Sequence, residues 1–279
     1  MISILNLGRC EYGTALDLQQ TLVELRKAGR IPNVLLFVEH PPVITLGRNA
    51  KEGNIVAPRE LLASRGVELF EINRGGDVTF HGPGQLVAYP IFDLRSFTPK
   101  LGVIEFVRNL EEVLMRVAVQ YGIETQRIKG MTGVWTKAEP PVRVLKNNQR
   151  TEAGPRDLGP AWQERKIAAI GVHVSRGVTS HGFALNVTTD LDCFNLIVPC
   201  GLTKPVTSIE LETGERPSLD EVMTHASRNF SDVFRSQVLW LDSIHDLIPA
   251  AEAAPPPQDT PAQPPAELRR MHGDDTHFA

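Results

Sequence analysis

The stretch KIAAIGVHVSRGVTSHGFALNVT, residues Lys166–Thr188, predicts two strands that pair as a hairpin. Lys166–Ser175 is largely apolar, and its odd positions from Ile167 onward share one face. Gly182–Thr188 is the second strand, and the residues RGVTSH between them form the connection. Because a hairpin makes neighbouring strands antiparallel, we expect a largely antiparallel sheet.

Strands and helices alternate irregularly on both sides of this hairpin. An apolar stripe at helical spacing predicts a helix over Gly102–Gly122. Ser218 and Glu221 match a capping box and predict a helix over Ser218–Ser236. We also expect a helix over Glu11–Arg30, a short helix from Pro58, and strands over Ile2–Leu7, Asn33–His40, Val43–Gly47, Val67–Asn73, Gln85–Leu94 and Gly133–Thr136. This mixture predicts an α+β fold with a central mixed, largely antiparallel sheet flanked by helices.

The composition fits a protein with a sizeable core. The chain has 279 residues, is 42% hydrophobic and carries a formal net charge of −4, whereas a general nucleic-acid binder is normally basic. No apolar run reaches the ~18 residues of a membrane span, and the N-terminus lacks the pattern of a signal peptide. The three cysteines have no disulfide framework, so we expect a cytoplasmic protein.

Two segments differ in composition from the rest of the chain. Residues 137–165 are mostly polar, and we expect a mobile insertion loop between two strands. Residues 251–279 are rich in proline and poor in large apolar residues, which predicts a disordered tail. The folded domain is therefore expected within residues 1–240.

A second motif, RGGDVTFHGPGQLVAYP over Arg74–Pro90, places four glycines at the start of an expected strand. It is not a Walker loop, because GxxxxGK[ST] does not occur, and it is not a dinucleotide fingerprint, because a strand follows it. From the residues alone two interpretations stay open. Gly75 and Gly76 let the backbone approach a ligand closely, or the segment is a bulged edge hairpin with a hydrogen-bonded His81.

From the residues alone, Cys200 and Lys166 are two candidates for covalent chemistry. Cys200 lies between a proline and a glycine after an apolar run, and Lys166 begins an apolar strand. A free thiol with a pKa of about 8.5 is only a few per cent thiolate at pH 7, and a nearby ammonium lowers that pKa. The alternatives are a thiol that only forms part of a turn and a solvated lysine at a strand end.

The other cysteines and the histidines give weaker signals. Cys193 has apolar neighbours and is expected to pack, whereas Cys10 is compatible with packing or reactivity. The histidines and cysteines lack the CxxC or HxxxH spacing of zinc sites, so no metal site is expected.

These motifs occur in the order that is typical of one enzyme family. RGGDVTFHGPGQLVAYPIFDL, then GVWT, then KIAAIGVHVSRGVTSHGFALNVTTDLDCFNLIVPCGL resemble the lipoyl(octanoyl) transferases of lipoate biosynthesis. The resemblance extends from about Leu5 to about Phe234, except for residues 137–165. It implies the fold of biotin- and lipoate-protein ligase catalytic domains, with residues 1–240 as the catalytic domain.

The resemblance implies acyl transfer through a covalent thioester. Octanoyl-acyl-carrier-protein would donate its octanoyl group to Cys200, and the group would pass to a lysine of a lipoyl domain, in a 2-oxo-acid dehydrogenase subunit or the glycine-cleavage H protein. Lys166 would lower the pKa of the thiol and shuttle the proton. No cofactor, nucleic acid or membrane is implied, and we expect a monomer. The implied substrate pocket comprises Arg74, Gly75, Gly76, Asp77, Val78, Thr79, Phe80, His81, Ala169, Ile170, Gly171, Gly182, Phe183 and Ala184.

Within that pocket, the glycines would leave space for the acyl chain and the thioester carbonyl. Backbone N–H groups near Gly75–Gly76 or Gly171 would stabilise the oxyanion. His81 would position or polarise the thioester, act as an acid or base, or brace its loop. Arg74 would meet phosphopantetheine or the carrier protein, or pair locally, and His181 is expected to be structural.

Two other functions remain open. One is an ATP-dependent lipoate or biotin ligase of the same fold, although biotin ligases carry a GRGR-type loop where this chain has EINRGGDVTF. The other is an acyl-binding protein in which Cys200 is inert.

Overall fold

The predicted hairpin lies within a large sheet. In the computed structural model, β11 (Lys166–Ser175) pairs antiparallel with β12 (Val178–Asn186). The structure describes residues 1–50, 52–137, 142–144, 150–152, 163–198 and 204–247. The other strands of this sheet are β1 (Ile2–Arg9), β2 (Asn33–Glu39), β6 (Gln85–Ile91), β7 (Thr125–Ile128), β8 (Met131–Thr136) and β13 (Val238–Leu241).

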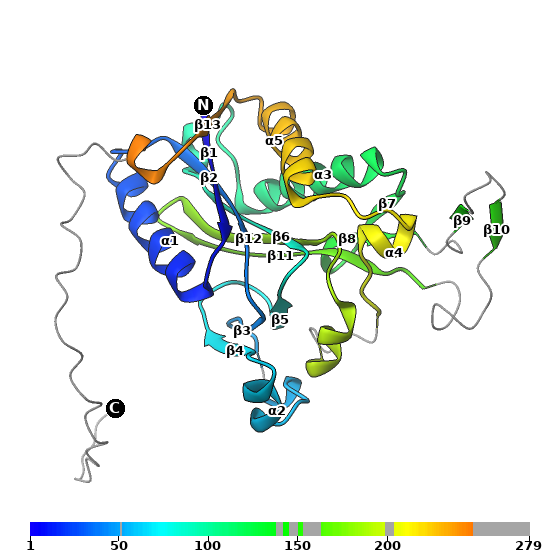
Figure 1. The fold of residues 1–279 in the computed structure, drawn as a ribbon. Helices are drawn as coiled ribbons and strands as arrows, with labels where there is room; N and C mark the ends of the chain where they lie inside the picture. The colour runs from blue at the N-terminus through cyan, green and yellow to red at the C-terminus, as the bar shows by residue number, and fades with distance from the viewer. Residues whose placement is uncertain (51, 138–141, 145–149, 153–162, 199–203, 248–279) are drawn as a thin grey trace, which may run out of the picture.

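The order of the eight strands is β13-β1-β2-β6-β12-β11-β8-β7 (Figure 1). β1 runs parallel to both of its neighbours, β13 and β2. Every other pair of adjacent strands in this sheet is antiparallel. The predicted α+β class, with a mixed and largely antiparallel sheet, is confirmed.

The turn of the central hairpin is tighter than the sequence predicts. β12 begins at Val178, so only Arg176 and Gly177 connect the two strands. Both have positive φ, 50° and 85°, which is the geometry of a two-residue hairpin turn that matches the strand twist. The predicted connection RGVTSH was therefore wrong beyond its first two residues.

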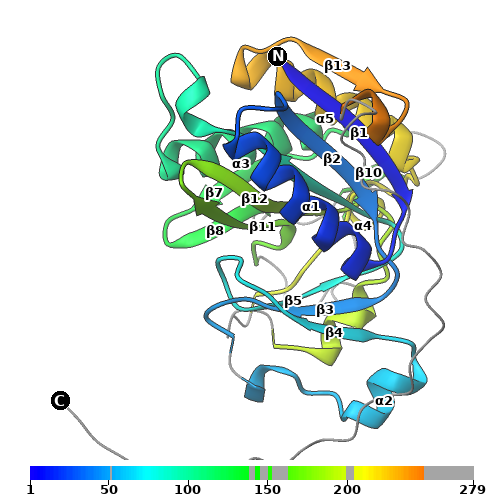
Figure 2. The same cartoon turned by 90° about the vertical axis from the view of Figure 1, so that its left-hand side faces the viewer.

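Helices cover both faces of the large sheet (Figures 1 and 2). α1 (Tyr12–Lys27) packs on one face, while α3 (Val103–Gln120) and α5 (Leu219–Phe234) pack on the other. Strand β6, between these layers, is buried along its whole length. The two remaining α-helices are α2 (Arg59–Ser64) and α4 (Ile209–Thr213). No helix in the described part of the chain is long and apolar enough to cross a membrane.

A second, smaller sheet lies beside the first, with the order β4-β3-β5 (Figure 2). Its strands are β3 (Val43–Leu46), β4 (Glu68–Glu71) and β5 (Val78–His81). It has its own core, in which Phe80 meets Phe194 edge-on with ring centroids 5.7 Å apart. Phe194 belongs to the 3₁₀ turn η3 (Leu191–Leu196), so the chain leading toward Cys200 is anchored on this sheet.

Helix α5 has half of the predicted capping box. The Ser218 hydroxyl accepts a hydrogen bond from the Glu221 backbone N–H at 3.2 Å. The Glu221 carboxylate instead accepts from the Tyr121 hydroxyl, also at 3.2 Å, at the end of α3. The carboxylate therefore links two helices where the sequence pattern predicts a bond to its own helix terminus.

Within residues 137–165, the structure describes a two-stranded ribbon. β9 (Val142–Val144) and β10 (Arg150–Glu152) pair antiparallel. The prediction of mobility for most of this segment, and that of a disordered tail at residues 251–279, fall outside the described residues.

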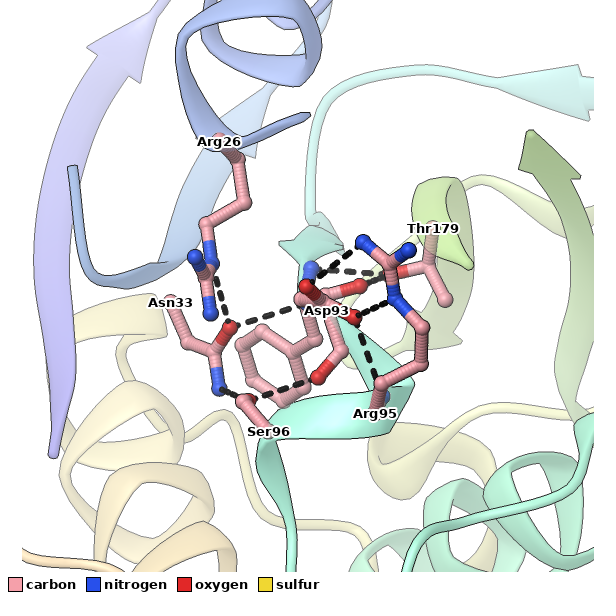
Figure 3. A network of polar contacts seen from close by, with 7 residues as sticks. Arg26, Asn33, Asp93, Arg95, Ser96 and Thr179 are labelled. Carbon is pink, nitrogen blue, oxygen red and sulfur yellow. Dashed lines mark hydrogen bonds and ion pairs between the residues drawn. The ribbon is translucent and has the colours of Figure 1, made fainter. Parts of the chain in front are cut away.

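Polar contacts fasten one end of α1 to the large sheet (Figure 3). The Asn33 side-chain oxygen accepts from Arg26 Nε and from the Asp93 backbone N–H, both at 2.9 Å. The Asn33 amide donates to the Ser96 hydroxyl at 3.1 Å. Arg26 lies in the last turn of α1, so these bonds attach that end of the helix to β2 and to the segment after β6.

Candidate active site

A pocket lies between the large and the small sheet. The empty space within it, counting open solvent at its mouth, is about 790 Å³. It brings together Lys166 and all but two of the predicted pocket residues, namely Arg74, Gly76, Asp77, Val78, Thr79, His81, Ala169, Ile170, Gly171, Gly182, Phe183 and Ala184.

Eight further residues that the expected pocket did not include line this pocket, and six of them lie within the motifs quoted above. They come from α1, β6, β12, η3 and the segment before α4, so they converge only in the folded chain. They are Tyr12, Gln85, Val87, Tyr89, His181, Asn186, Phe194 and Val206.

Gly75 and Phe80 are not among the residues that line the pocket. The Phe80 side chain points into the core of the small sheet and is 1% exposed. The Gly75 backbone N–H donates to the Val172 carbonyl at 3.0 Å, so it is not available as the oxyanion donor that we expected there.

Arg74 pairs locally, which is one of its two expected roles. Its guanidinium donates to the Thr45 carbonyl at 2.7 Å, to the Thr45 hydroxyl at 3.0 Å and to the Gly75 carbonyl at 3.1 Å. The residue is 8% exposed. Arg74 therefore ties the glycine-rich loop to β3 at the edge of the pocket.

Gly171 and Gly182 face each other across the hairpin, and the protein itself requires both to be small. A Cβ on Gly182 would overlap the Ala88 carbonyl oxygen of β6. A Cβ on Gly171 would lie 2.8 Å from the Gly75 carbonyl oxygen. The interpretation that these glycines leave space for an acyl chain is corrected: neighbouring backbone occupies that space.

Replacing Gly182 by alanine should therefore destabilise the fold. We expect the free energy of unfolding to fall by about 1–3 kcal/mol or more, because β6 cannot move away from the centre of the sheet. Gly53→Ala is the matched control, since nothing lies within 4 Å of the position that its Cβ would take. Urea denaturation measures both, and equal stability of Gly182→Ala and the wild type would contradict this explanation.

Both the backbone and the side chain of Lys166 contact neighbouring residues. Its N–H donates to the Pro205 carbonyl and its carbonyl accepts from the Thr207 N–H, both at 2.9 Å. Val206 thus runs beside the start of β11 as an isolated parallel bridge. The ammonium nitrogen lies 4.9 Å from the centroid of the Trp135 ring, a favourable cation–π distance.

Cys200 lies outside the described residues. The last described residue before it, Val198, donates from its backbone N–H to the Asn54 carbonyl at 2.8 Å. The Asn54 amide in turn donates to the Asp77 carboxylate at 2.6 Å, and Asp77 lines the pocket. The described chain on each side of Cys200 is therefore attached to residues beside or within the pocket.

The two described cysteines are poorly suited to nucleophilic attack. Burial and the nearby Asp190 carboxylate raise the pKa of Cys193, and burial with the Glu11 carboxylate raises that of Cys10. A raised pKa leaves less thiolate at neutral pH. Neither thiol lines the pocket.

His81 is a buried neutral imidazole. Its Nδ1 lies 2.7 Å from the Gln85 side-chain oxygen. Burial, reinforced by His40 and opposed by the Gln85 hydrogen bond, lowers its pKa to about 3. The lowered pKa disfavours an imidazolium near pH 7, which weighs against the acid role among those expected for His81.

Tyr12 and His40 contact His81, and Tyr89 contacts His40. The Tyr12 ring stacks on His81 at a centroid distance of 6.2 Å. His40 donates from Nδ1 to the Cys10 carbonyl and accepts at Nε2 from the Tyr89 hydroxyl, both at 2.7 Å. Burial lowers the pKa of His40 to about 4, so this wall of the pocket is neutral at physiological pH.

The chain is similar to one family of known proteins. The model of the lipoyl protein ligase A/B catalytic domain matches residues 11–231. The chain belongs to this family. Its relatives in the family include an octanoyltransferase from Koribacter versatilis, 58% identical over 279 residues and covering 100% of both chains. An octanoyltransferase from Acidobacterium capsulatum is 52% identical, covering 89% of this chain and 96% of its own.

Solved structures of the family share the fold. A bipartite lipoate protein ligase from Thermoplasma acidophilum superposes with a TM-score of 0.60 at 17% identity, covering 86% of this chain and 88% of that one. A lipoate-protein ligase A bound with ATP gives 0.55 at 17% identity, covering 86% and 90%. The octanoyltransferase relatives identify this family member as an acyltransferase, and the resemblance found in the sequence is confirmed.

Proposed function

We propose that this acyltransferase moves an octanoyl group from octanoyl-acyl-carrier-protein to a lysine of lipoyl domains, through a thioester on Cys200. The observation that carries the proposal is the full-length octanoyltransferase relative at 58% identity. The pocket supports it, because it combines Lys166 with apolar and small side chains of β11 and β12. The proposed acceptors are 2-oxo-acid dehydrogenase subunits and the glycine-cleavage H protein, met in the cytoplasm.

The first step forms the acyl-enzyme. The Cys200 thiolate attacks the carbonyl carbon of the donor thioester, a new C–S bond forms, and the bond to the carrier's thiol breaks. The proton released by Cys200 goes to that leaving thiolate. Lys166 stabilises the thiolate with its ammonium group and relays the proton. One thioester replaces another, so the activated acyl bond is conserved without ATP.

The second step transfers the acyl group to nitrogen. The neutral ε-amine of the acceptor lysine attacks the thioester carbonyl, forming a C–N bond while the bond to the Cys200 sulfur breaks. The amine proton ends on that sulfur, which restores the thiol. An amide is more stable than a thioester, so this step drives the sequence forward.

Chain connectivity supports the pairing of Cys200 with Lys166. Val206, six positions after Cys200, forms a backbone bridge with Lys166. Only six residue steps, each at most ~3.3–3.6 Å long, therefore separate Cys200 from that bridge along the chain. Of the three cysteines, the two whose surroundings are described have raised pKa values and lie outside the pocket lining.

The pocket is suited to a medium-length acyl chain. Val87, Ile170 and Phe183 contribute apolar surface to its lining, and Ala169 and Ala184 contribute small side chains. At about 0.8 kcal/mol per buried CH₂, an octanoyl chain gains roughly 5 kcal/mol on entering such a site. That gain explains how an uncharged chain can be bound without polar contacts along its length.

Nucleotide dependence tests the proposal against a ligase of the same fold. Purified protein is mixed with octanoyl-acyl-carrier-protein and a lipoyl domain, with ATP and Mg²⁺ either absent or present. We expect N-octanoylation of the lipoyl-domain lysine at equal rates in both mixtures. Transfer of free octanoate that requires ATP would make the protein a ligase, and binding without any transfer would make it an acyl-binding protein.

A further inference from the structure

A chain of hydrogen bonds through Asn186 and Gln85 fixes the orientation of the His81 ring. Two hydrogen bonds orient the Gln85 amide: its nitrogen donates to the Phe80 carbonyl at 3.3 Å and to the Asn186 side-chain oxygen at 2.9 Å. Asn186 is oriented in the same way, since its amide nitrogen donates to the Thr207 carbonyl at 2.9 Å. Both backbone carbonyls can only accept, so neither amide can be turned round without losing bonds.

This chain of bonds determines which nitrogen of His81 carries the proton. The Gln85 side-chain oxygen must accept, so the His81 Nδ1 must donate to it at 2.7 Å. A neutral imidazole has one N–H, and therefore Nε2 holds a lone pair. In the part of the chain that the structure describes, Nε2 has no hydrogen-bond partner, and His81 lines the pocket.

The surroundings of His81 favour its neutral form. Gln85 is 1% exposed and Asn186 4%, so water does not compete for these bonds. The charged and titratable groups that act on the His81 ring or line the same pocket are His40 after β2, His181 on β12, Tyr12 on α1, Tyr89 on β6, Lys166 on β11, and Arg74 and Asp77 before β5. Asp77 is the carboxylate among them; it accepts from the Asn54 amide and from the Val78 N–H, and it is not among the groups that shift the pKa of His81.

We propose that Gln85 is a positioning residue that holds His81 with its proton on Nδ1, so that the Nε2 lone pair accepts a hydrogen bond from the ε-amine of the acceptor lysine. This role rests on the proposed function. The attacking amine needs its own lone pair free to reach the thioester carbonyl. A group that donates to the amine would occupy that lone pair, whereas a group that accepts an N–H directs the lone pair toward the carbonyl.

His81 does not take the amine proton in this scheme. The C–N bond forms and the bond between the acyl carbon and the Cys200 sulfur breaks. The proton leaves the amine nitrogen and ends on that sulfur, while His81 stays neutral throughout. Its role is therefore confined to the second step and leaves acylation of Cys200 largely unaffected.

Three variants separate this role from a structural one. Gln85→Leu removes the bond that orients His81. Gln85→Glu keeps an acceptor for Nδ1 but adds a carboxylate, which raises the pKa of His81. Gln19→Leu is the matched control, because Gln19 is also 1% exposed and its side-chain oxygen accepts from the backbone N–H of His181 rather than from His81.

Long-range ¹H–¹⁵N spectra of the histidines and single-turnover kinetics are measured between pH 5 and 9. In the wild type and in Gln19→Leu, His81 should carry its proton on Nδ1 and should not titrate. Gln85→Leu should slow transfer from the acyl-enzyme on the order of 10- to 100-fold, with acylation changed less than threefold. Gln85→Glu should lose rate, relative to its own rate at high pH, as pH falls through the raised pKa of His81.

Each of several results would overturn the role proposed for Gln85 and His81. A wild-type His81 that is protonated on Nε2 would overturn the inference without any activity measurement. So would a Gln85→Glu enzyme with the wild-type pH profile, or a Gln85→Leu enzyme in which both steps slow equally. A wild type that forms no acyl-enzyme would instead overturn the proposed function, and with it this role.

Discussion

Replacing Cys200 by serine is expected to abolish octanoyl transfer, by roughly 10³-fold or more, as losses of a catalytic nucleophile generally do. Serine keeps nearly the same size, but its hydroxyl is almost wholly protonated at pH 7, and Lys166 cannot lower its pKa far enough to make it reactive. Transfer to a lipoyl domain, followed by mass spectrometry of that domain, measures the loss.

The other thiols provide matched controls for this change. Cys193→Ser and Cys10→Ser should retain transfer within about twofold, because burial and nearby carboxylates already keep both thiols protonated. If Cys200→Ser stayed active while Cys193→Ser or Cys10→Ser lost activity, the nucleophile would have been assigned to the wrong residue.

Replacing Lys166 by alanine is expected to slow acylation of Cys200 by roughly 10²- to 10⁴-fold, the usual contribution of a positioned acid or base. Removal of the ammonium raises the pKa of the thiol, so the rate should recover as pH rises toward the ordinary thiol pKa of about 8.5. Lys166→Arg should keep the low thiol pKa but lose the proton relay, because a guanidinium does not deprotonate.

Labelling of Cys200 with iodoacetamide between pH 5 and 10 measures the effect of the Lys166 ammonium on the thiol pKa separately from turnover. The wild-type profile should lie at lower pH than that of Lys166→Ala. Lys27→Ala serves as the control, since Lys27 pairs with Glu24 at the end of α1, outside the pocket. Identical labelling profiles for Lys166→Ala and the wild type would remove Lys166 from the mechanism.

Elements with strong local patterns were predictable from the sequence. The apolar stripe of α3 places Phe106, Leu110 and Val117 in the core, and the structure buries all three. The hairpin of β11 and β12 follows from two apolar runs separated by a turn. Such features depend on neighbours within a few residues, which a single sequence records directly.

Features that depend on long-range pairing were not predictable in this way. β13 (Val238–Leu241) joins the sheet beside β1, more than 200 positions away, and makes that edge parallel. Gly182 is small because Ala88 of β6 passes against it, and nothing in the run SHGFALN identifies that neighbour. The choice of glycine was visible in the sequence, but its cause lies in another strand.

The candidate site also contains residues that the sequence identified and residues that only the fold brings into place. Arg74, His81 and Lys166 were found because family motifs carry them, and the pocket contains all three. Tyr12 lies at the start of the helix expected over Glu11–Arg30, and Gln85 begins the strand expected over Gln85–Leu94. Both matter because folding places them against His81, and that proximity had no periodic signal.

The most direct test of transfer through Cys200 is intact-mass spectrometry of the wild-type protein after mixing with octanoyl-acyl-carrier-protein in the absence of ATP. We predict a gain of one octanoyl group that maps to Cys200, is removed by neutral hydroxylamine, and disappears when a lipoyl domain is added. A protein that stays unmodified while the lipoyl domain is octanoylated, or that carries the group on another residue, would contradict transfer through a Cys200 thioester.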